Sequence, residues 1–293
     1  MHATLLKLAR ALRNRAATAA LAALLCAAAF AASGPALAQR AYPTPEAAAE
    51  AMGDAIASSD RAALAQVLGA GYPALLPEGG VHQDDIYAFL AAWARHHAIQ
   101  PQGADRAVVA VGDSGWTFPV PLARTPAGWK FDLAAGRKEV HARRIGRNEL
   151  ATLDTLRQLA EAQQRYAQQV GGGRYATRLV SSAGKTDGLY WPAVSAGDPS
   201  PLGPDALAMG PDTPPEAAFY GYHYRVLPPG SGGDATFRFI AWPARYGQSG
   251  VHTFVMGSDR VAYQRDLGPA TAARAAALRT FAPGEGWARV ENP

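Results

Sequence analysis

Apolar residues recur at two different periods along the chain, and each period predicts a different kind of element. Between residues 44 and 95 they return every three or four positions, the spacing of a helix with one buried face. Thr44 followed by Pro45 is typical of an N-cap and a first helical residue. We therefore predict one helix from Thr44 to about residue 56, a second from Arg61 to Leu68, and a third that opens near Asp84.

The pattern then changes to short β-branched and aromatic runs separated by turn residues. The runs are Ala107–Val111, Trp116–Leu122 and Trp129–Leu133. They predict a three-stranded meander. Together with the helices before it, the meander makes an N-terminal α+β block over residues 39–135.

A long polar segment over residues 136–170 predicts a central helix that joins this block to the rest of the chain. Leu150, Leu153, Leu156 and Leu159 lie on it at steps of three. Each step of three falls about 60° short of a full turn, so the first and last leucines face opposite sides. We expect this helix to be packed from two sides.

Residues 171–293 predict an antiparallel domain. A Gly-, Pro- and Asp-rich connection over residues 184–218 has little periodic pattern, and four strand-like runs with short turns and an Ala-rich helix come after it. The runs are Tyr220–Leu227, Phe237–Trp242, Val251–Met256 and Val261–Arg265, and the helix is Thr271–Arg279. The predicted fold class for the whole chain is α+β.

The first 38 residues have the composition of a cleavable export signal. An Ala-rich apolar run over residues 16–32 follows four basic residues and no acidic one: Lys7, Arg10, Arg13 and Arg15. Ala36-Leu37-Ala38 then presents small residues at alternate positions, as signal peptidase requires. The apolar run is shorter than the roughly 20 residues of a membrane span. We predict cleavage after Ala38, no membrane span in the mature chain, and a periplasmic or secreted protein.

Removing this signal changes the charge of the protein. The full chain has 28 basic and 24 acidic residues, and subtracting the four basic residues of the signal leaves 24 of each, so the mature net charge is zero. A neutral chain gives no reason to expect a nucleic-acid partner. The single cysteine, Cys26, lies in the removed segment, which excludes disulfides and Cys-ligated zinc from the mature protein.

Five separated segments resemble one bacterial family. They are Gly115–Leu122, Gly128–Asp132, Arg144–Leu150, Ala241–Val251 and Tyr263–Gly268. In this order they look like the family labelled domain of unknown function 2950. The resemblance covers nearly all of the mature chain. It implies an exported bacterial protein, but no particular activity and no catalytic residues.

The second half is also similar to the soluble half of type IV pilins and pseudopilins. The similarity rests on a Leu-rich helix that runs into a Gly-rich break over residues 148–173, followed by a long loop and a small antiparallel sheet. Pilins polymerise through a long apolar N-terminal helix, whereas a separate α+β block occupies that position here. The resemblance therefore implies a pilin-like domain and not a pilus subunit.

Two serine motifs and one histidine pair do not support catalysis or metal binding. Gly112-Asp113-Ser114-Gly115 matches the nucleophile segment of trypsin-like proteases, but too few residues precede it, and a turn is the better interpretation. Gly247-Gln248-Ser249-Gly250-Val251 lacks the last glycine of a nucleophile elbow. His96 and His97 would point about 100° apart on a helix, so they cannot bind one ion together.

Four aspartates in the 184–218 connection are weak candidates for a metal site: Asp187, Asp198, Asp205 and Asp212. Oxygen ligands on a loop suit calcium. Their spacing matches no calcium-binding loop, however, and aspartate is common in turns. We predict no cofactor and no metal, with calcium as the alternative.

The strongest candidate surface is aromatic. Tyr220, Tyr222 and Tyr224 alternate along one predicted strand and would share a face, which Trp191, Trp242 and Tyr246 could extend. If this face is open, it is suited to bind a glycan, a peptide or an envelope protein. The other interpretation is that the rings pack under the central helix.

The spacing of residues along the chain does not indicate any catalytic site made of a nucleophile, a base and a group that orients the base. The sequence therefore favours a non-enzymatic binding module of the envelope. One alternative is a hydrolase of envelope polymers that uses carboxylates such as Asp187 or Glu216. Another is a structural scaffold for a dedicated partner protein.

Overall fold

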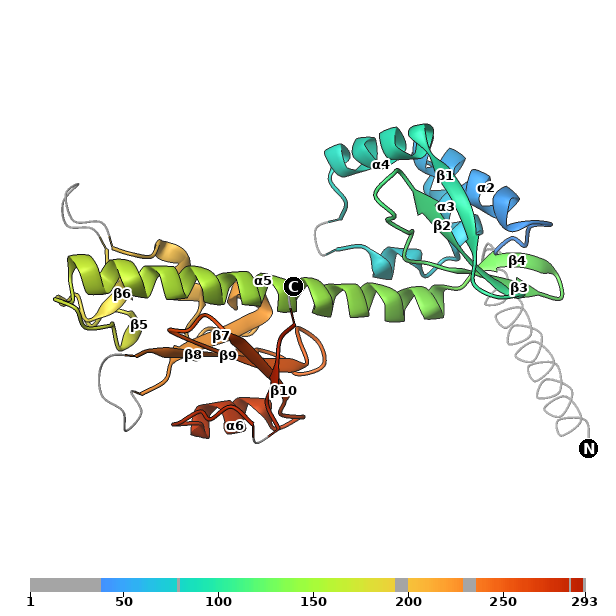
Figure 1. The fold of residues 1–293 in the computed structure, drawn as a ribbon. Coiled ribbons are helices and arrows are strands. Elements are labelled where there is room, and N and C mark those ends of the chain that lie inside the picture. The colour runs from blue at the N-terminus through green and yellow to red at the C-terminus, as the bar shows by residue number, and fades with distance from the viewer. Residues whose placement is uncertain (1–37, 78–79, 193–199, 229–235, 285, 292–293) are drawn as a thin grey trace, which may run out of the picture. The chain divides into compact units, whose positions relative to one another are not determined.

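The computed structural model describes residues 38–77, 80–192, 200–228, 236–284 and 286–291 (Figure 1). The chain divides into two compact units, residues 1–139 and 140–293, and the boundary falls inside the long helix α5 (Leu133–Gln169). Helices and mainly antiparallel sheets form both units, which confirms the α+β class. The predicted signal peptide lies outside the described residues, apart from Ala38.

The helices of unit 1 begin where the sequence places capping residues. The Thr44 hydroxyl accepts a hydrogen bond from Ala47 N at 3.1 Å, and the Asp60 carboxylate caps the next helix in the same way. Caps satisfy amide groups that a helix leaves unpaired, which is why these boundaries agree with the prediction. The elements are α2 (Pro45–Ala57), α3 (Arg61–Leu68), the 3-10 helix η1 (Tyr72–Leu75) and α4 (Gln83–Arg95).

A four-stranded antiparallel meander, in the order β1-β2-β3-β4, shares one apolar core with these helices. The sequence predicts β2 and β4 and misses β1, and its middle strand, Trp116–Leu122, shares only Leu122 with β3. The predicted strand at Trp116 begins only at Leu122, because Pro119 and Pro121 have no N–H to donate to a ladder. The strands are β1 (His97–Pro101), β2 (Arg106–Val111), β3 (Leu122–Thr125) and β4 (Gly128–Phe131).

His97 lies at the start of β1 and links this strand to two helices. Its Nε2 donates to Glu50 Oε1 at 2.9 Å, its Nδ1 donates to Trp93 O at 2.9 Å, and its ring stacks on Trp93 with centroids 4.1 Å apart. Both ring nitrogens act as donors only in the protonated imidazole. The hydrogen bond to Glu50, followed by the one to Trp93 O, raises the pKa of His97 above its ordinary value.

We expect His97 to make the stability of unit 1 depend on pH. Because the folded state binds this proton more tightly than the unfolded state, the contribution is complete below about pH 6.5 and is lost as the pH rises through the raised pKa. His97→Gln should remove this part of the pH dependence of urea unfolding. The contribution of His97 to stability is below about 1 kcal/mol, because the side chains of His97 and Glu50 are both partly exposed.

The control for this experiment is His82→Gln, which changes an exposed histidine of the same unit. It should leave the pH dependence as it is in the wild type. If His97→Gln and the wild type lose stability equally between about pH 6 and about pH 8, the pair with Glu50 contributes nothing.

Unit 2 is built on a five-stranded antiparallel sheet in the order β11-β10-β9-β8-β7, as the short turns predict. The 184–218 connection also contains regular structure, because β6 and the 3-10 helix η2 lie within it. The strands of the sheet are β7 (Tyr222–Val226), β8 (Arg238–Pro243), β9 (His252–Gly257), β10 (Ala262–Asp266) and β11 (Ala288–Arg289). The other elements are β5 (Arg178–Val180), β6 (Gly188–Tyr190), η2 (Pro204–Ala208), η3 (Phe219–Gly221) and α6 (Thr271–Ala277).

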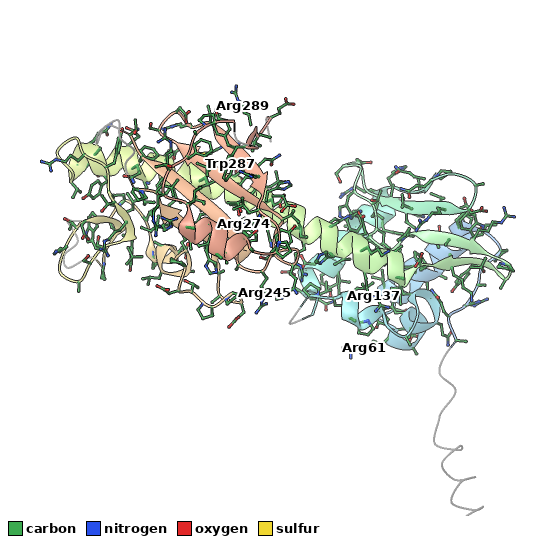
Figure 2. All side chains as sticks on the ribbon, turned by 90° about the horizontal axis from the view of Figure 1, so that it is seen from below. Arg61, Arg137, Arg245, Arg274, Trp287 and Arg289 are labelled. Carbon is green, nitrogen blue, oxygen red and sulfur yellow. The ribbon has the colours of Figure 1, made fainter. Side chains whose placement is uncertain are left out.

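α5 spans Leu133–Gln169 and passes through Gly146 without a break. In unit 2 it packs on one face of the sheet, while α6 and Trp287 pack on the other (Figures 1 and 2). Leu153, Leu156 and Leu159 are buried in a single core, whereas Leu150 is 53% exposed. The expectation of packing on two sides is therefore wrong at Leu150, and one broad face of α5 holds the other three leucines. No helix in the described part of the chain has the length and hydropathy of a membrane span.

Candidate functional site

Tyr222 and Tyr224 lie beneath α5 and not on an open surface. They alternate with His223 as predicted, but both rings are fully buried. The Tyr224 hydroxyl donates to Thr152 Oγ1 at 3.3 Å, and burial raises the pKa of Tyr224 to about 12. The prediction that these two residues lie on an open aromatic face is therefore wrong. They pack under the central helix, as the other interpretation has it.

The other four aromatic candidates do not form one surface. Trp191 belongs to the same core as Tyr224, and Trp242 lies on the opposite face of the sheet in the core beneath α6. The Tyr246 hydroxyl donates to Asp266 Oδ2 at 3.1 Å. Tyr220 is 55% exposed, but it precedes β7 in a left-handed conformation with φ of 49° and does not continue the alternation.

Two of the acidic candidates, Asp187 and Glu216, have structural partners. Asp187 accepts hydrogen bonds from Ser182 N and Ser182 Oγ at 2.7 and 2.9 Å, which lower its pKa and close a turn before β6. Glu216 pairs with Arg245 at 3.0 Å. Asp205 lies on η2 and Asp212 follows it, whereas Asp198 lies outside the described residues. No cluster of three or more His, Cys, Asp or Glu side chains suited to a metal occurs in the part of the chain that the structure describes.

The two serine motifs both lie in turns. Asp113 and Ser114 occupy the exposed connection after β2, and Ser249 Oγ donates to Arg245 O in the loop between β8 and β9. Among the described contacts, neither serine has a hydrogen bond to a histidine. The interpretation of both motifs as turns agrees with this geometry.

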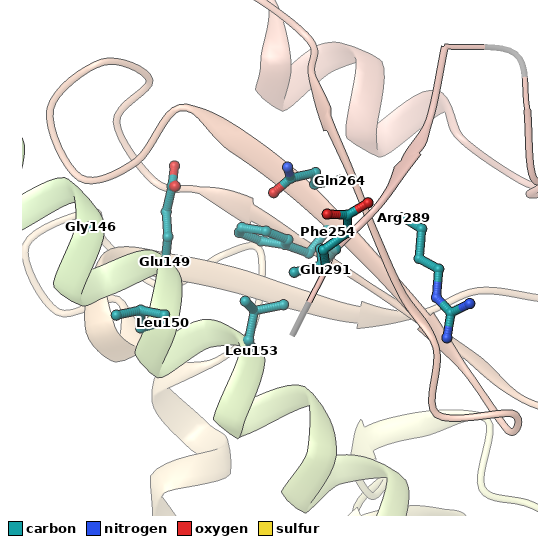
Figure 3. A pocket seen from close by; sticks show the side chains of 9 residues that line it. Gly146, Glu149, Leu150, Leu153, Phe254, Gln264, Arg289 and Glu291 are labelled. Carbon is teal, nitrogen blue, oxygen red and sulfur yellow. The ribbon is translucent and has the colours of Figure 1, made fainter. Parts of the chain in front are cut away.

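A groove of about 520 Å³ lies beside α5 in unit 2 (Figure 3). Its apolar lining comes from Leu150 and Leu153 on α5, Phe254 on β9, and Val290 after β11. Its polar lining is Glu149, Gln264, Arg289 and Glu291. Figure 3 shows Glu149, Gln264 and Glu291 around Phe254, while the Arg289 side chain extends away from them. A groove of this volume has room for a small ligand or a few residues of a peptide.

The groove exists because one helix is too narrow to cover the sheet. Five strands spaced by about 4.8 Å are about 19 Å wide, whereas a helix with its side chains is about 10 Å in diameter. α5 packs mainly over β7, β8 and β9, where the fully buried rings lie. The same face of β10, which carries Gln264, and the end of β11 remain beside the helix, and they form the opposite wall.

The α5 wall of the groove has two features that the fold itself does not require. Gly146 is in the middle of a helix, where glycine costs roughly 1 kcal/mol relative to alanine, and a Cβ there would meet no atom within 4 Å. Leu150, one turn later, exposes about half of its side chain. A glycine beside an exposed leucine gives another chain room to approach the helix closely.

Polar side chains of α5 fix the loop at one end of this groove. Glu149 Oε1 accepts from Val251 N and His252 N at 2.9 and 3.0 Å, and Glu149 Oε2 lies 3.2 Å from His252 Nδ1. Asn148 Nδ2 donates to Ser249 O at 2.8 Å, and His141 Nε2 donates to Gly247 O at 2.7 Å. Three successive contacts thus hold the loop before β9 against the helix.

Sequence reasoning does not find these residues, although one signal points to them. The segments Arg144–Leu150 and Ala241–Val251 are two of the five that carry the family resemblance. They are about 100 residues apart in the chain, and the contacts of Asn148 and Glu149 bring them together. Periodicity describes each segment alone and cannot pair them.

The fold and the groove define a two-unit α+β protein in which a long helix packs on a five-stranded antiparallel sheet and leaves a groove beside it. The chain belongs to the family described as protein of unknown function (DUF2950), whose pattern matches residues 39–290. This match confirms the family resemblance seen in the sequence. No curated protein matches the chain, and no solved structure does.

Proposed function

We propose that this protein is an exported, non-enzymatic binding module of the bacterial envelope, and that the groove of unit 2 binds an extended peptide segment of its partner. The observation that carries the proposal is the strip of Gly146 and the exposed Leu150, which faces polar side chains across the groove. An apolar floor with polar groups at its border suits a peptide that inserts one apolar side chain and hydrogen-bonds on both sides.

The arrangement of unit 2 supports a pilin-like domain as part of this proposal. The second half of α5 packs on an antiparallel sheet, and a glycine-rich break follows the helix. In the sequence, unit 1 comes before this part of α5, where pilins have their polymerising helix. The proposal therefore concerns a domain that binds a partner and does not polymerise.

Export is supported by the contacts of the first residue after the predicted cleavage site. The Gln39 side chain donates to Val67 O, Leu68 O and Phe131 O at 3.1, 3.1 and 2.7 Å, so the first residue after the predicted cleavage site is part of unit 1. The family match also begins at residue 39. We expect mass spectrometry of the protein from intact bacteria to find an N-terminal peptide that starts at Gln39. A protein that retains residues 1–38 contradicts cleavage after Ala38.

Substitution of Leu150 tests the groove. A carboxylate at this position would have to be desolvated on binding, so Leu150→Glu should lower retention of the envelope partner by purified residues 39–293 at least about tenfold. Leu207→Glu is the matched control, because Leu207 is 58% exposed in the same unit but does not line the groove. Equal retention by the two variants contradicts the proposed site.

A further inference from the structure

We infer that unit 1 carries a second binding site, a sugar-binding platform made by Trp116 with Asp113 and Ser114. All three residues are exposed and belong to the short connection after β2, and Trp116 exposes 43% of its surface. This site lies outside the groove and does not depend on the function proposed for it. It would bind neutral glycans in which the sugar rings present a flat C–H face.

The backbone of this connection is fixed at both ends. Val111 N donates to Trp116 O at 2.9 Å, and Phe118 N donates to Val109 O at 2.7 Å. Gly112 and Gly115 have φ of 71° and 75°, which glycine adopts without strain. The turn therefore presents its side chains from a defined position at the end of the sheet.

The Trp116 ring is also held in place, although it is exposed. It makes edge contacts with Phe89 and Phe118, with centroids 6.2 and 6.5 Å apart and interplanar angles of 78° and 75°. Phe118 in turn contacts the buried Phe131 at 5.9 Å. An exposed ring supported in this way loses little conformational entropy when a ligand stacks on it.

The exposed polar groups of the same turn select the class of ligand. In the described contacts, the carboxylate of Asp113 and the hydroxyl of Ser114 have no hydrogen-bond partner, and the connection contains no lysine or arginine. A carboxylate accepts hydrogen bonds from two neighbouring hydroxyls of one sugar, while the C–H face of the ring stacks on indole. Rings with equatorial substituents, as in β-1,4-linked glucose and N-acetylglucosamine, have the flattest such face.

The test is titration of residues 39–293 with cellotetraose and with chitotetraose, followed by calorimetry and tryptophan fluorescence. We expect saturable binding of at least one of them, which Trp116→Ala weakens at least about tenfold and Asp113→Asn weakens about threefold or more. Asp113→Asn is isosteric on an exposed turn, so it tests the site even if Trp116→Ala destabilises unit 1. Tyr87→Ala is the control, because it removes another exposed ring of the same unit.

Three results would overturn the inference. One is no saturable binding of either oligosaccharide by the wild type up to about 10 mM, in which case the surface is left to a protein partner. The second is binding that Trp116→Ala and Asp113→Asn both leave unchanged. The third is an equal loss in Tyr87→Ala, which would indicate adsorption to exposed aromatic rings in general.

Discussion

Replacing Tyr224 with alanine is expected to lower the free energy of unfolding of unit 2 by about 3 to 5 kcal/mol. The ring is fully buried on β7 beneath α5, and its removal would leave a cavity in a core that also holds Leu156 and Phe239. Urea unfolding followed by circular dichroism measures the loss. Tyr224→Phe keeps the packing and removes the hydroxyl that donates to Thr152, so it should cost about 1 kcal/mol.

Tyr220→Ala is the matched control for this experiment. Tyr220 is 55% exposed and precedes the strand, so its removal should cost about 1 kcal/mol or less. If Tyr224→Ala is no more destabilising than Tyr220→Ala, the strand does not pack under α5. The open aromatic face would then have to be considered again.

The second large effect is expected at Glu149. Glu149→Ala should cost about 2 to 4 kcal/mol, because two backbone N–H groups, of Val251 and His252, lose a charged acceptor in a partly buried place. Hydrogen exchange of these two amides measures the effect locally, and both should exchange faster in the variant. Glu149→Gln keeps one oxygen acceptor, so its loss of stability should be about half of that in Glu149→Ala.

Glu161→Ala serves as the control for Glu149, because it removes an exposed carboxylate from the same helix. It should leave the exchange of Val251 and His252 unchanged. Unchanged exchange in Glu149→Ala as well would mean that the loop before β9 is held by other contacts.

Local signals account for the elements that the sequence predicts well. Thr44 with Pro45, and Asp60 with Gly69, set helix boundaries through hydrogen bonds within a few residues, so the chain pattern alone locates them. The sheet of unit 2 is also predicted, because its alternating runs bury one set of side chains beneath α5 and the other beneath α6.

Elements that depend on a distant partner are the ones the sequence misses. β1 ends in Pro101 and is a strand only because it pairs with β2, and β11 is two residues long and is defined by its pairing with β10. The period of the leucines on α5 suggests two packed sides. It does not show that the sheet leaves Leu150 uncovered, which depends on the width of the sheet.

The candidate site could not be predicted for the same reason. The sequence correctly predicts that Tyr222 and Tyr224 lie on the same face of a strand. Whether that face is open to solvent depends on the distant element that covers it. The groove lies where α5 stops covering the sheet, and its walls come from residues 146, 149, 150, 153, 254, 264 and 289–291. Nothing in the local pattern of any one segment marks it.

Site-specific photo-crosslinking in the cells that make the protein tests the central claim most directly. A photoreactive phenylalanine analogue at Leu150 should give one discrete adduct with a partner protein, and Leu150 lines the groove. The same analogue at Leu207, which is equally exposed in unit 2, should give none. No adduct at Leu150, or the same adducts from both positions, would contradict the proposal that the groove binds the partner.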